Sequence, residues 1–325
     1  MTVLVTGGAG YVGSHAVKEL RANGIPCVIL DNLERGHREL ALDTELIVGD
    51  IADTSLVSRI IADHRITAVM HFAAFAYVGE SMHNPAIYYR NNVAATASML
   101  ETIIRCGVRM FVFSSTCSTY GLPETVPMTE EHPQRPVNPY GAGKLMVERM
   151  LQDFDTAYGL KSIVLRYFNA AGADPSGQIG EWHEPETHLI PLALQVASGL
   201  RPGIEVYGTD YPTPDGTCIR DYIHVTDLAH AHVLGLRRLQ AGQGSDVFNL
   251  GNGRGFSVRE VIDAAERVTG RRISWSPAAR RDGDPHSLVG SVDKAQRVLG
   301  WAPRYAALST IIETAWKWHC KQAAR

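Results

Sequence analysis

The sequence predicts an α/β fold with a doubly wound parallel sheet and a smaller mixed α/β lobe beside it. Short apolar runs alternate with helical patterns from Thr2 to about Arg166. Such alternation is typical of a parallel sheet whose two faces are covered by helices. After Arg166 this rhythm stops, and turn-forming glycines and prolines separate shorter elements. The second half is therefore predicted to form the smaller lobe.

The first half is predicted to contain six strands and four helices. The strands are apolar runs, and the connections between them are expected to be right-handed crossovers. We place the strands at Thr2–Thr6, Cys27–Leu30, Glu45–Val48, Ala68–Phe72, Met110–Ser114 and Ser162–Arg166. We place the helices at Tyr11–Asn23, Ser55–Ala62, Pro85–Cys106 and Tyr140–Tyr158.

The second half begins with an irregular insertion that is rich in proline and glycine, from about Pro175 to Pro191. Further along, Ser257 and Glu260 have the spacing of a capping box, which predicts a helix through about Thr269. We expect two domains, residues 1–168 and residues 169–325, with an approximate boundary that the chain can cross again.

Composition excludes several classes of protein. The formal net charge of -3 is too small to favour nucleic acid or an anionic membrane. No apolar run approaches the roughly 20 residues that span a bilayer. The five cysteines include no C-x-x-C pair, so neither a disulfide framework nor a thiolate zinc site is predicted. A buried strand is predicted from Thr2 onward, so no secretory leader is expected. We expect a cytoplasmic protein without a metal site.

A glycine motif follows the first predicted strand directly and opens the first helix. Gly7, Gly10 and Gly13 form G-x-x-G-x-x-G, a variant of the dinucleotide fingerprint of Rossmann-type folds. Glycines let backbone N–H groups approach a pyrophosphate at the helix N-terminus. Asp31 follows the second strand, where its carboxylate can bind ribose hydroxyls and would repel a 2′-phosphate. NAD is therefore predicted rather than NADP, with Asp50 after the third strand beside the adenine.

Tyr140 and Lys144 have the Y-x-x-x-K spacing on a predicted helix. Residues four apart share one helix face, so the Lys144 ammonium can approach the Tyr140 phenol. A nearby cation is expected to lower the pKa of Tyr140 from about 10 towards working pH and so to make it a general base. Hydroxyls at Ser114–Thr116 end a neighbouring strand, where a parallel sheet binds its ligand.

Together these motifs resemble the extended short-chain dehydrogenase/reductase family, and most closely its UDP-galactose 4-epimerase type. The resemblance covers nearly the whole chain. Its motifs in the second half are Phe168-Asn169, Gly172–Gly177, Asp210–Thr213, Asp215–Thr217, Arg220–Val225, Asn249–Gly251 and Arg281-Asp282-Gly283-Asp284-Pro285.

The resemblance implies a role for each matching position. Tyr140 would act as base and acid at the sugar 4-hydroxyl, with Lys144 and Thr116 beside it. Cofactor contacts are implied for Gly7, Gly10, Tyr11, Val12, Gly13, Asp31, Asn32, Asp50, Ile51, Phe72, Ala73, Ala74, Asn91, Ser114, Tyr140, Lys144 and Tyr167. Substrate contacts are implied for Thr116, Asn169, His188, Leu189, Tyr207, Arg220, Tyr222, Val258, Arg281 and Asp284.

The implied reaction is reversible 4-epimerisation of UDP-galactose and UDP-glucose, a step of galactose metabolism. Tightly bound NAD takes a hydride from C4 and returns it to the other face of a 4-keto sugar. Related dehydratases and decarboxylases carry one or two carboxylates after the Ser/Thr. The segment Thr116-Cys117-Ser118-Thr119-Tyr120 has none, and elimination needs an additional acid and base.

Three positions depart from the common epimerase pattern. Ala76 stands where many relatives place a cofactor-contacting lysine, so weaker cofactor retention is expected. His188 replaces an asparagine near the diphosphate, and Leu288 replaces a bulky tyrosine that limits N-acetylated sugars. Leu288 keeps UDP-N-acetylhexosamine as an alternative substrate. The segment Ser114–Gly121 also resembles the corresponding stretch of UDP-xylose 4-epimerases, which keeps UDP-xylose/arabinose as another.

A non-catalytic regulator that senses NAD is a different class of protein. It is disfavoured because Tyr140 and Lys144 are both present. The resemblance further implies a homodimer formed through helices Pro85–Cys106 and Tyr140–Tyr158.

Overall fold

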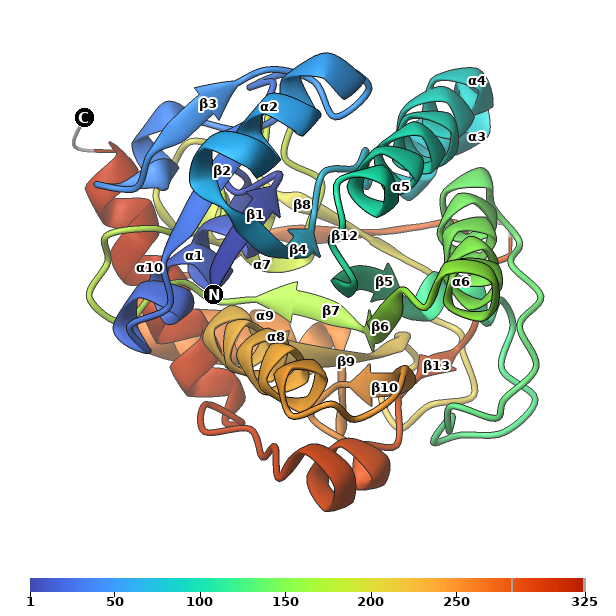
Figure 1. Cartoon of the computed structure of the whole chain (residues 1–325). Helices are drawn as coiled ribbons and strands as arrows, with labels where there is room; N and C mark the ends of the chain where they lie inside the picture. The colour runs from blue at the N-terminus through green and yellow to red at the C-terminus, as the bar shows by residue number, and fades with distance from the viewer. Residues whose placement is uncertain (282, 324–325) are drawn as a thin grey trace.

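A computed structural model describes residues 1–281 and 283–323, and it shows a seven-stranded parallel sheet between two layers of helices (Figure 1). Asp282 of the Arg281–Pro285 motif lies outside the described residues. The strand order is β10-β6-β5-β4-β1-β2-β3. The strands are β1 (Thr2–Thr6), β2 (Cys27–Asp31), β3 (Leu46–Val48), β4 (Ile66–His71), β5 (Met110–Thr116), β6 (Lys161–Tyr167) and β10 (Asp246–Leu250). The predicted doubly wound α/β fold is confirmed.

The chain reverses its direction of travel across the sheet beside β1. Strands β2 and β3 lie on one side of β1, while β4, β5 and β6 follow on the other. Ligands of such sheets bind in the crevice outside the carboxyl ends of the strands, at this switch point. The loops that leave β1, β2, β4 and β5 therefore define where the site must be.

Two apolar clusters hold the helices on opposite faces of this sheet (Figure 1). Helices α1 (Tyr11–Ala22) and α8 (Val225–Gln240) cover one face. Helices α2 (Thr54–His64), α5 (Thr96–Arg105) and α6 (Pro139–Tyr158) cover the other. Apart from the edge strand β3, where Val48 is exposed, the apolar runs predicted as strands are largely buried, as a sheet between two helical layers requires.

The helix predicted at Pro85–Cys106 is interrupted, which corrects the sequence analysis. It consists of α4 (Pro85–Tyr88), a π-helical segment η2 (Tyr89–Ala95) and α5. Within η2 the buried Asn92 side chain accepts a hydrogen bond from the Phe75 N–H and donates one to the Phe75 carbonyl, both at 2.9 Å. The wider π turn accompanies this link to the loop after β4, and such turns often occur at functional sites.

The smaller lobe contains a four-stranded sheet, a pair of strands and three helices. The sheet is β7 (Asn169–Ala171), β9 (Ile219–His224), β11 (Gly255–Ser257) and β13 (Ser287–Leu288). The strand pair is β8 (Ile204–Tyr207) and β12 (Trp275–Ala278), and the helices are α7 (Leu189–Ala197), α9 (Val258–Thr269) and α10 (Leu308–Ala323). Between these elements the chain returns to the large sheet, where α8 covers one face and β10 pairs with β6.

The predicted capping box at the start of α9 is confirmed. The Ser257 hydroxyl accepts from the Glu260 N–H at 3.0 Å, and the Glu260 carboxylate accepts from the Ser257 N–H at 2.7 Å. Among the described residues, no helix combines the length and apolarity needed to cross a bilayer.

A buried ion pair fastens α6 to the centre of the large sheet. Arg166 on β6 and Glu148 on α6 are 4% and 2% exposed, and the guanidinium Nη2 lies 2.6 Å from the carboxylate. Ser115 on β5 donates to the same carboxylate at 2.5 Å. Arg166 also donates to the Tyr120 hydroxyl at 3.0 Å, and Tyr120 donates to Asn249 on β10 at 2.6 Å. One polar network therefore joins α6 to three neighbouring strands.

Arg166→Met is expected to lower the free energy of unfolding by about 3–5 kcal/mol, because it leaves Glu148 buried without its counter-charge. Urea unfolding measures this loss. The double variant Arg166→Met/Glu148→Leu should recover most of it. Arg149→Met removes an exposed ion pair with Asp153 on the same helix and should cost less than about 1 kcal/mol. Equal losses in the two single variants would contradict the prediction.

Candidate functional site

A cavity of about 690 Å³ lies between the carboxyl ends of the large sheet and the smaller lobe. Every residue to which the sequence analysis gave a catalytic, cofactor or substrate contact lines this cavity. The residues come from strand ends, loops and the first turns of helices, and they are spread from Gly7 to Asp284. The structure thus brings the predicted positions together, while the ligand group that each one contacts stays a prediction.

Two glycines of the glycine loop have no room for a side chain, so the loop packs tightly and its backbone can come close to a pyrophosphate. Gly7 has φ +71°, and a Cβ there would lie 2.5 Å from the backbone nitrogen of Ala73. A Cβ on Gly13 would collide with the Gly7 carbonyl oxygen. At Gly10 the only close atom is that same oxygen, at 3.4 Å, so this position borders open space. The helix N-terminus of α1 is therefore exposed to the cavity, as dinucleotide binding requires.

Asp31 holds the turn after β2 in place at the edge of the cavity. Its carboxylate accepts from the N–H groups of Ala9 and Leu33, both at 2.9 Å. Burial raises the pKa of Asp31, against these two hydrogen bonds, which lower it. Asn32 donates to Asp50 at 3.2 Å and so joins the ends of β2 and β3. The carboxylates of Asp31 and Asp50 thus both border the cavity, at the ends of β2 and β3.

The catalytic candidates meet at the N-terminal end of α6. Asn138 caps this helix by accepting from the Gly141 N–H at 2.8 Å, and Pro139 occupies its first position. Tyr140 lies close enough to Thr116, at the end of β5, for the Thr116 hydroxyl to lower the pKa of Tyr140. Lys144 is 3% exposed, and its Nζ donates to the Ser114 carbonyl at 2.8 Å. Tyrosine, lysine and hydroxyl therefore converge, as their spacing predicts.

The expected lowering of the Tyr140 pKa is wrong for the protein by itself. Burial raises the pKa of Tyr140, and nearby Tyr167 raises it further. These two effects outweigh that of the Thr116 hydroxyl, which lowers the pKa. Burial also lowers the pKa of Lys144 to about 7, although Glu148 opposes this shift. Desolvation disfavours the charged form of both groups, so the lysine charge that would stabilise a phenolate is itself weakened.

The substrate candidates line the opposite side of the cavity. Arg220 on β9 forms an ion pair of 2.5 Å with Asp284, and the Arg281 guanidinium lies 4.0 Å from the Tyr207 ring centroid. Asn169 donates to the Asp221 carbonyl at 3.0 Å. Two guanidinium groups on one wall suit a diphosphate, because they bind phosphate oxygens bidentately.

The three residues that depart from the common epimerase pattern differ in whether they line the cavity. Ala76 and His188 line it directly. Leu288 instead packs in a small apolar cluster with Cys117 and Phe168, which do line the cavity. An effect of Leu288 on the sugar pocket would therefore be transmitted through these two side chains.

Several cavity residues were missed by sequence reasoning. Arg35 pairs with Glu80 at 2.8 Å and lies over the Tyr77 ring at 5.2 Å. No spacing rule connects these positions. Glu181, His183 and Glu186 were also missed; they group with His188, a predicted substrate contact, in the segment interpreted as an irregular insertion. The signal of this group was visible as alternating Glu and His in E-x-H-x-x-E-x-H.

Comparisons with known proteins agree with this geometry. The model of the NAD dependent epimerase/dehydratase family matches residues 3–251. UDP-glucose 4-epimerase of Rhizobium meliloti (strain 1021) is 51% identical over 320 residues, which are 98% of this chain and 97% of the relative. The crystal structure of UDP-glucose 4-epimerase from Brucella ovis in complex with NAD has 49% identity and a TM-score of 0.95 over 97% of both chains. UDP-glucose-4-epimerase from Stenotrophomonas maltophila, with bound NAD and formylated UDP-arabinopyranose, has 40% identity and a TM-score of 0.97 over 100% of this chain and 99% of that one.

Lys144→Met is expected to change how stability depends on pH. Native Lys144 loses its proton near pH 7, whereas the unfolded lysine keeps it to about pH 10.5, so burial of the charge costs stability below pH 7 and this cost vanishes as the pH rises to 10.5. The thermal midpoint of the variant relative to wild type should therefore be highest at pH 6 and fall towards pH 10. Lys161→Met, at an exposed lysine, is the control. A difference that stays constant with pH would refute the assignment.

Proposed function

Because the chain belongs to the NAD dependent epimerase/dehydratase family, we propose that Tyr140, Lys144 and Thr116 catalyse its reaction, the reversible 4-epimerisation of a UDP-hexose with NAD as cofactor. The observation that carries this assignment is the convergence of the three side chains in one cavity that also contains the glycine loop and Arg281. A dinucleotide and a nucleotide sugar can then meet at Tyr140.

The protein side of the reaction is proton transfer and orientation. Tyr140 removes the proton of the sugar 4-hydroxyl and later returns one, while Thr116 hydrogen-bonds the same hydroxyl and aligns it. When bound, NAD supplies a reversible hydride acceptor at C4. Arg220 and Arg281 hold the diphosphate, so the sugar can turn over about a fixed anchor.

Activation of Tyr140 belongs to the loaded cavity in this proposal. Burial alone raises the pKa of Tyr140, so its phenolate needs an additional positive charge nearby. Bound ligands exclude water from the cavity, so each charge in the site interacts more strongly with its neighbours. Lys144, four residues away on α6, is the cation that the chain itself provides.

The cofactor contacts follow the order of the loops. The glycine loop with Tyr11 and Val12 would hold the pyrophosphate, and Asp31, Asn32, Asp50 and Ile51 the adenosine. The remaining cofactor candidates, Phe72 to Ala74, Asn91, Ser114 and Tyr167, border the path from there to Tyr140. Residues 1–168 would thus bind chiefly the cofactor and residues 169–325 chiefly the nucleotide sugar, with α8 and β10 completing the first unit.

A UDP-pentose is the second candidate substrate. The Stenotrophomonas maltophila structure holds a formylated UDP-arabinopyranose, and that protein is 40% identical to this chain. An N-acetylated hexose is a third candidate, favoured by Leu288 at the edge of the sugar region. Each of these would use the same proton and hydride chemistry.

We also propose a cytoplasmic homodimer. All five cysteines are free, which suits a reducing compartment. Tyr89 on η2 and Met146 on α6 are 37% and 45% exposed, and η2 packs against α6. Large apolar side chains exposed on neighbouring helices suit a face that a second copy covers.

Tyr140→Phe should lower kcat for conversion of UDP-galactose to UDP-glucose by about 10²–10⁴-fold, because it removes the general base and acid. Product analysis should show no net NADH release with wild type. Tyr158→Phe, at an exposed tyrosine on the same helix, should keep full activity. Conversion of UDP-xylose or UDP-N-acetylglucosamine alone would keep the mechanism and change the substrate. Full activity in Tyr140→Phe would refute the assignment.

Met146→Glu should convert the dimer into a monomer, because it places a charge in an apolar interface. Sedimentation velocity distinguishes the two masses. Leu200→Glu is the matched control, since Leu200 is 69% exposed and lies just beyond α7. A monomeric wild type, or an unchanged dimer in Met146→Glu, would contradict the proposed interface.

A further inference from the structure

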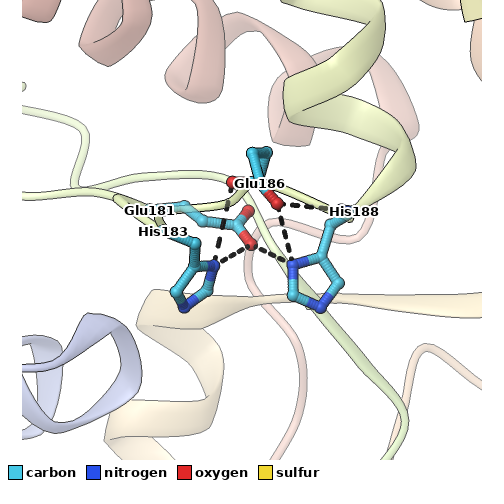
Figure 2. Close-up of side chains that lie close together, drawn as sticks. All are labelled: Glu181, His183, Glu186 and His188. Atoms are coloured by element: carbon cyan, nitrogen blue, oxygen red, sulfur yellow. Dashed lines mark hydrogen bonds and ion pairs between the residues drawn. The ribbon is translucent and has the colours of Figure 1, made fainter. Parts of the chain in front are cut away.

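Four side chains of the segment between β7 and α7 point towards a common centre at the rim of the cavity. They are Glu181, His183, Glu186 and His188, whose nearest donor atoms all lie within 4.8 Å of one another. Figure 2 shows the Glu181 carboxylate between the two imidazoles, with Glu186 completing the group. Among the described residues, this is the one group of three or more His, Cys, Asp or Glu with such spacing. The established reaction uses none of it as a group.

Donor atoms alternate around the centre as nitrogen and oxygen. His188 Nδ1 lies 2.8 Å from Glu181 Oε1 and 3.1 Å from Glu186 Oε1. His183 Nδ1 lies 3.2 Å from Glu181 Oε1 and 3.7 Å from Glu186 Oε2. A tetrahedral ion with bonds of about 2.0–2.2 Å separates its ligands by roughly 3.3–3.6 Å. The four nitrogen–oxygen separations therefore bracket this range. The other donor pairs lie within 4.8 Å, so side-chain rotations would have to draw the four groups together around an ion.

The hydrogen-bond geometry of two buried atoms, Glu181 Oε1 and His183 Nδ1, favours a bound cation over ion pairs between the side chains alone. The Glu181 side chain is 7% exposed, and its Oε1 has ion-pair contacts with both imidazoles but no hydrogen bond of regular geometry within the described part of the chain. Nδ1 of His183 is likewise buried without a hydrogen bond. The two atoms lie at contact distance, but they do not point at each other as donor and acceptor must. Buried polar atoms without hydrogen bonds require an explanation, and an unseen ion is one.

We propose that Glu181, His183, Glu186 and His188 form a binding site for one divalent transition-metal ion of the zinc class. Two imidazole nitrogens and two carboxylate oxygens are ligands that suit such an ion, and two carboxylates balance its charge. No metal site was predicted from the sequence, because the cysteines lack a zinc spacing and His188 was the one residue of this group given a role, a contact with the substrate.

The alternative is a network of ion pairs in which both imidazoles carry a proton. Contacts with Glu181 and Glu186 outweigh burial and would raise the pKa of His183 to about 9 and that of His188 to about 10. Both states are electrically balanced. They differ in whether the central position takes up a metal, which makes them separable by experiment.

The position of the site gives the ion a structural role. The His183 ring contacts Tyr11 of the glycine-loop helix edge-on at 6.1 Å and Tyr77 at 5.8 Å. His188 is the N-cap of α7 and directly precedes Leu189, a substrate candidate. An ion bound by both histidines would therefore hold the insertion beside Tyr11 and Tyr77 on the cofactor side of the cavity. It would also fix the position of the first residues of α7 on the substrate side.

The test uses full-length protein that has been treated with a chelator, desalted and titrated with Zn²⁺ or Co²⁺ in the absence of sugar nucleotide. Calorimetry should give one ion per chain, and Co²⁺ should show the intense visible absorption of four-coordinate geometry. Glu181→Gln and His183→Asn should each weaken binding by more than the roughly 10–100-fold that loss of an outer-shell partner costs. His64→Asn, which removes a surface histidine paired with Glu45, should bind as wild type does.

A second measurement controls for folding. Added Zn²⁺ should raise the thermal midpoint of wild type with increasing concentration, because it binds only the folded state, and should leave Glu181→Gln unchanged. Equal affinities in wild type and Glu181→Gln, a six-coordinate Co²⁺ spectrum, or Co²⁺–thiolate absorption from a cysteine would each overturn the site. Because no turnover is measured, these outcomes are independent of the epimerase assignment.

Discussion

The buried pair of Glu148 and Arg166 is the constraint on which the active geometry depends. Tyr140, Lys144 and Glu148 recur every four residues on α6 and so share one face of the helix. Fixing Glu148 against β5 and β6 therefore also fixes the rotation and height of the other two. A pair buried this deeply is costly to form, and it is retained only with its hydrogen bonds complete. Ser115 is one of the residues that complete them.

A second constraint is the way the insertion is tied to the first helix. The Tyr11 hydroxyl donates to the Gly172 carbonyl at 2.6 Å, and Lys18 forms an ion pair of 2.7 Å with Asp174. The first residues of the smaller lobe are therefore bonded to α1, the helix whose N-terminus borders the cavity. This connection places the segment with His188 over the switch point of the sheet, so the two halves of the chain enclose one cavity.

Desolvation explains where prediction from spacing succeeded and where it was wrong. The Y-x-x-x-K spacing correctly put Tyr140 and Lys144 on one helix, α6, where both line the cavity, because helix geometry is local. It predicted the wrong direction for the Tyr140 pKa, since that direction depends on burial by residues distant in sequence. The interruption at η2 was likewise invisible, because it accompanies the bonds of Asn92 to a loop 17 residues away.

The sequence by itself determined the fold class, the strands of the first half and one helix of the second. Apolar runs located all six strands of the first half, the glycine motif located the tight turn between β1 and α1, and the S-x-x-E spacing located α9, because each pattern acts within a few residues. Only the tertiary structure decided that β10 returns to the large sheet, that Arg220 pairs with Asp284, and that the Glu and His residues of the insertion share a centre. These contacts join residues on separate elements or depend on the path of an irregular loop, and neither is encoded in local periodicity.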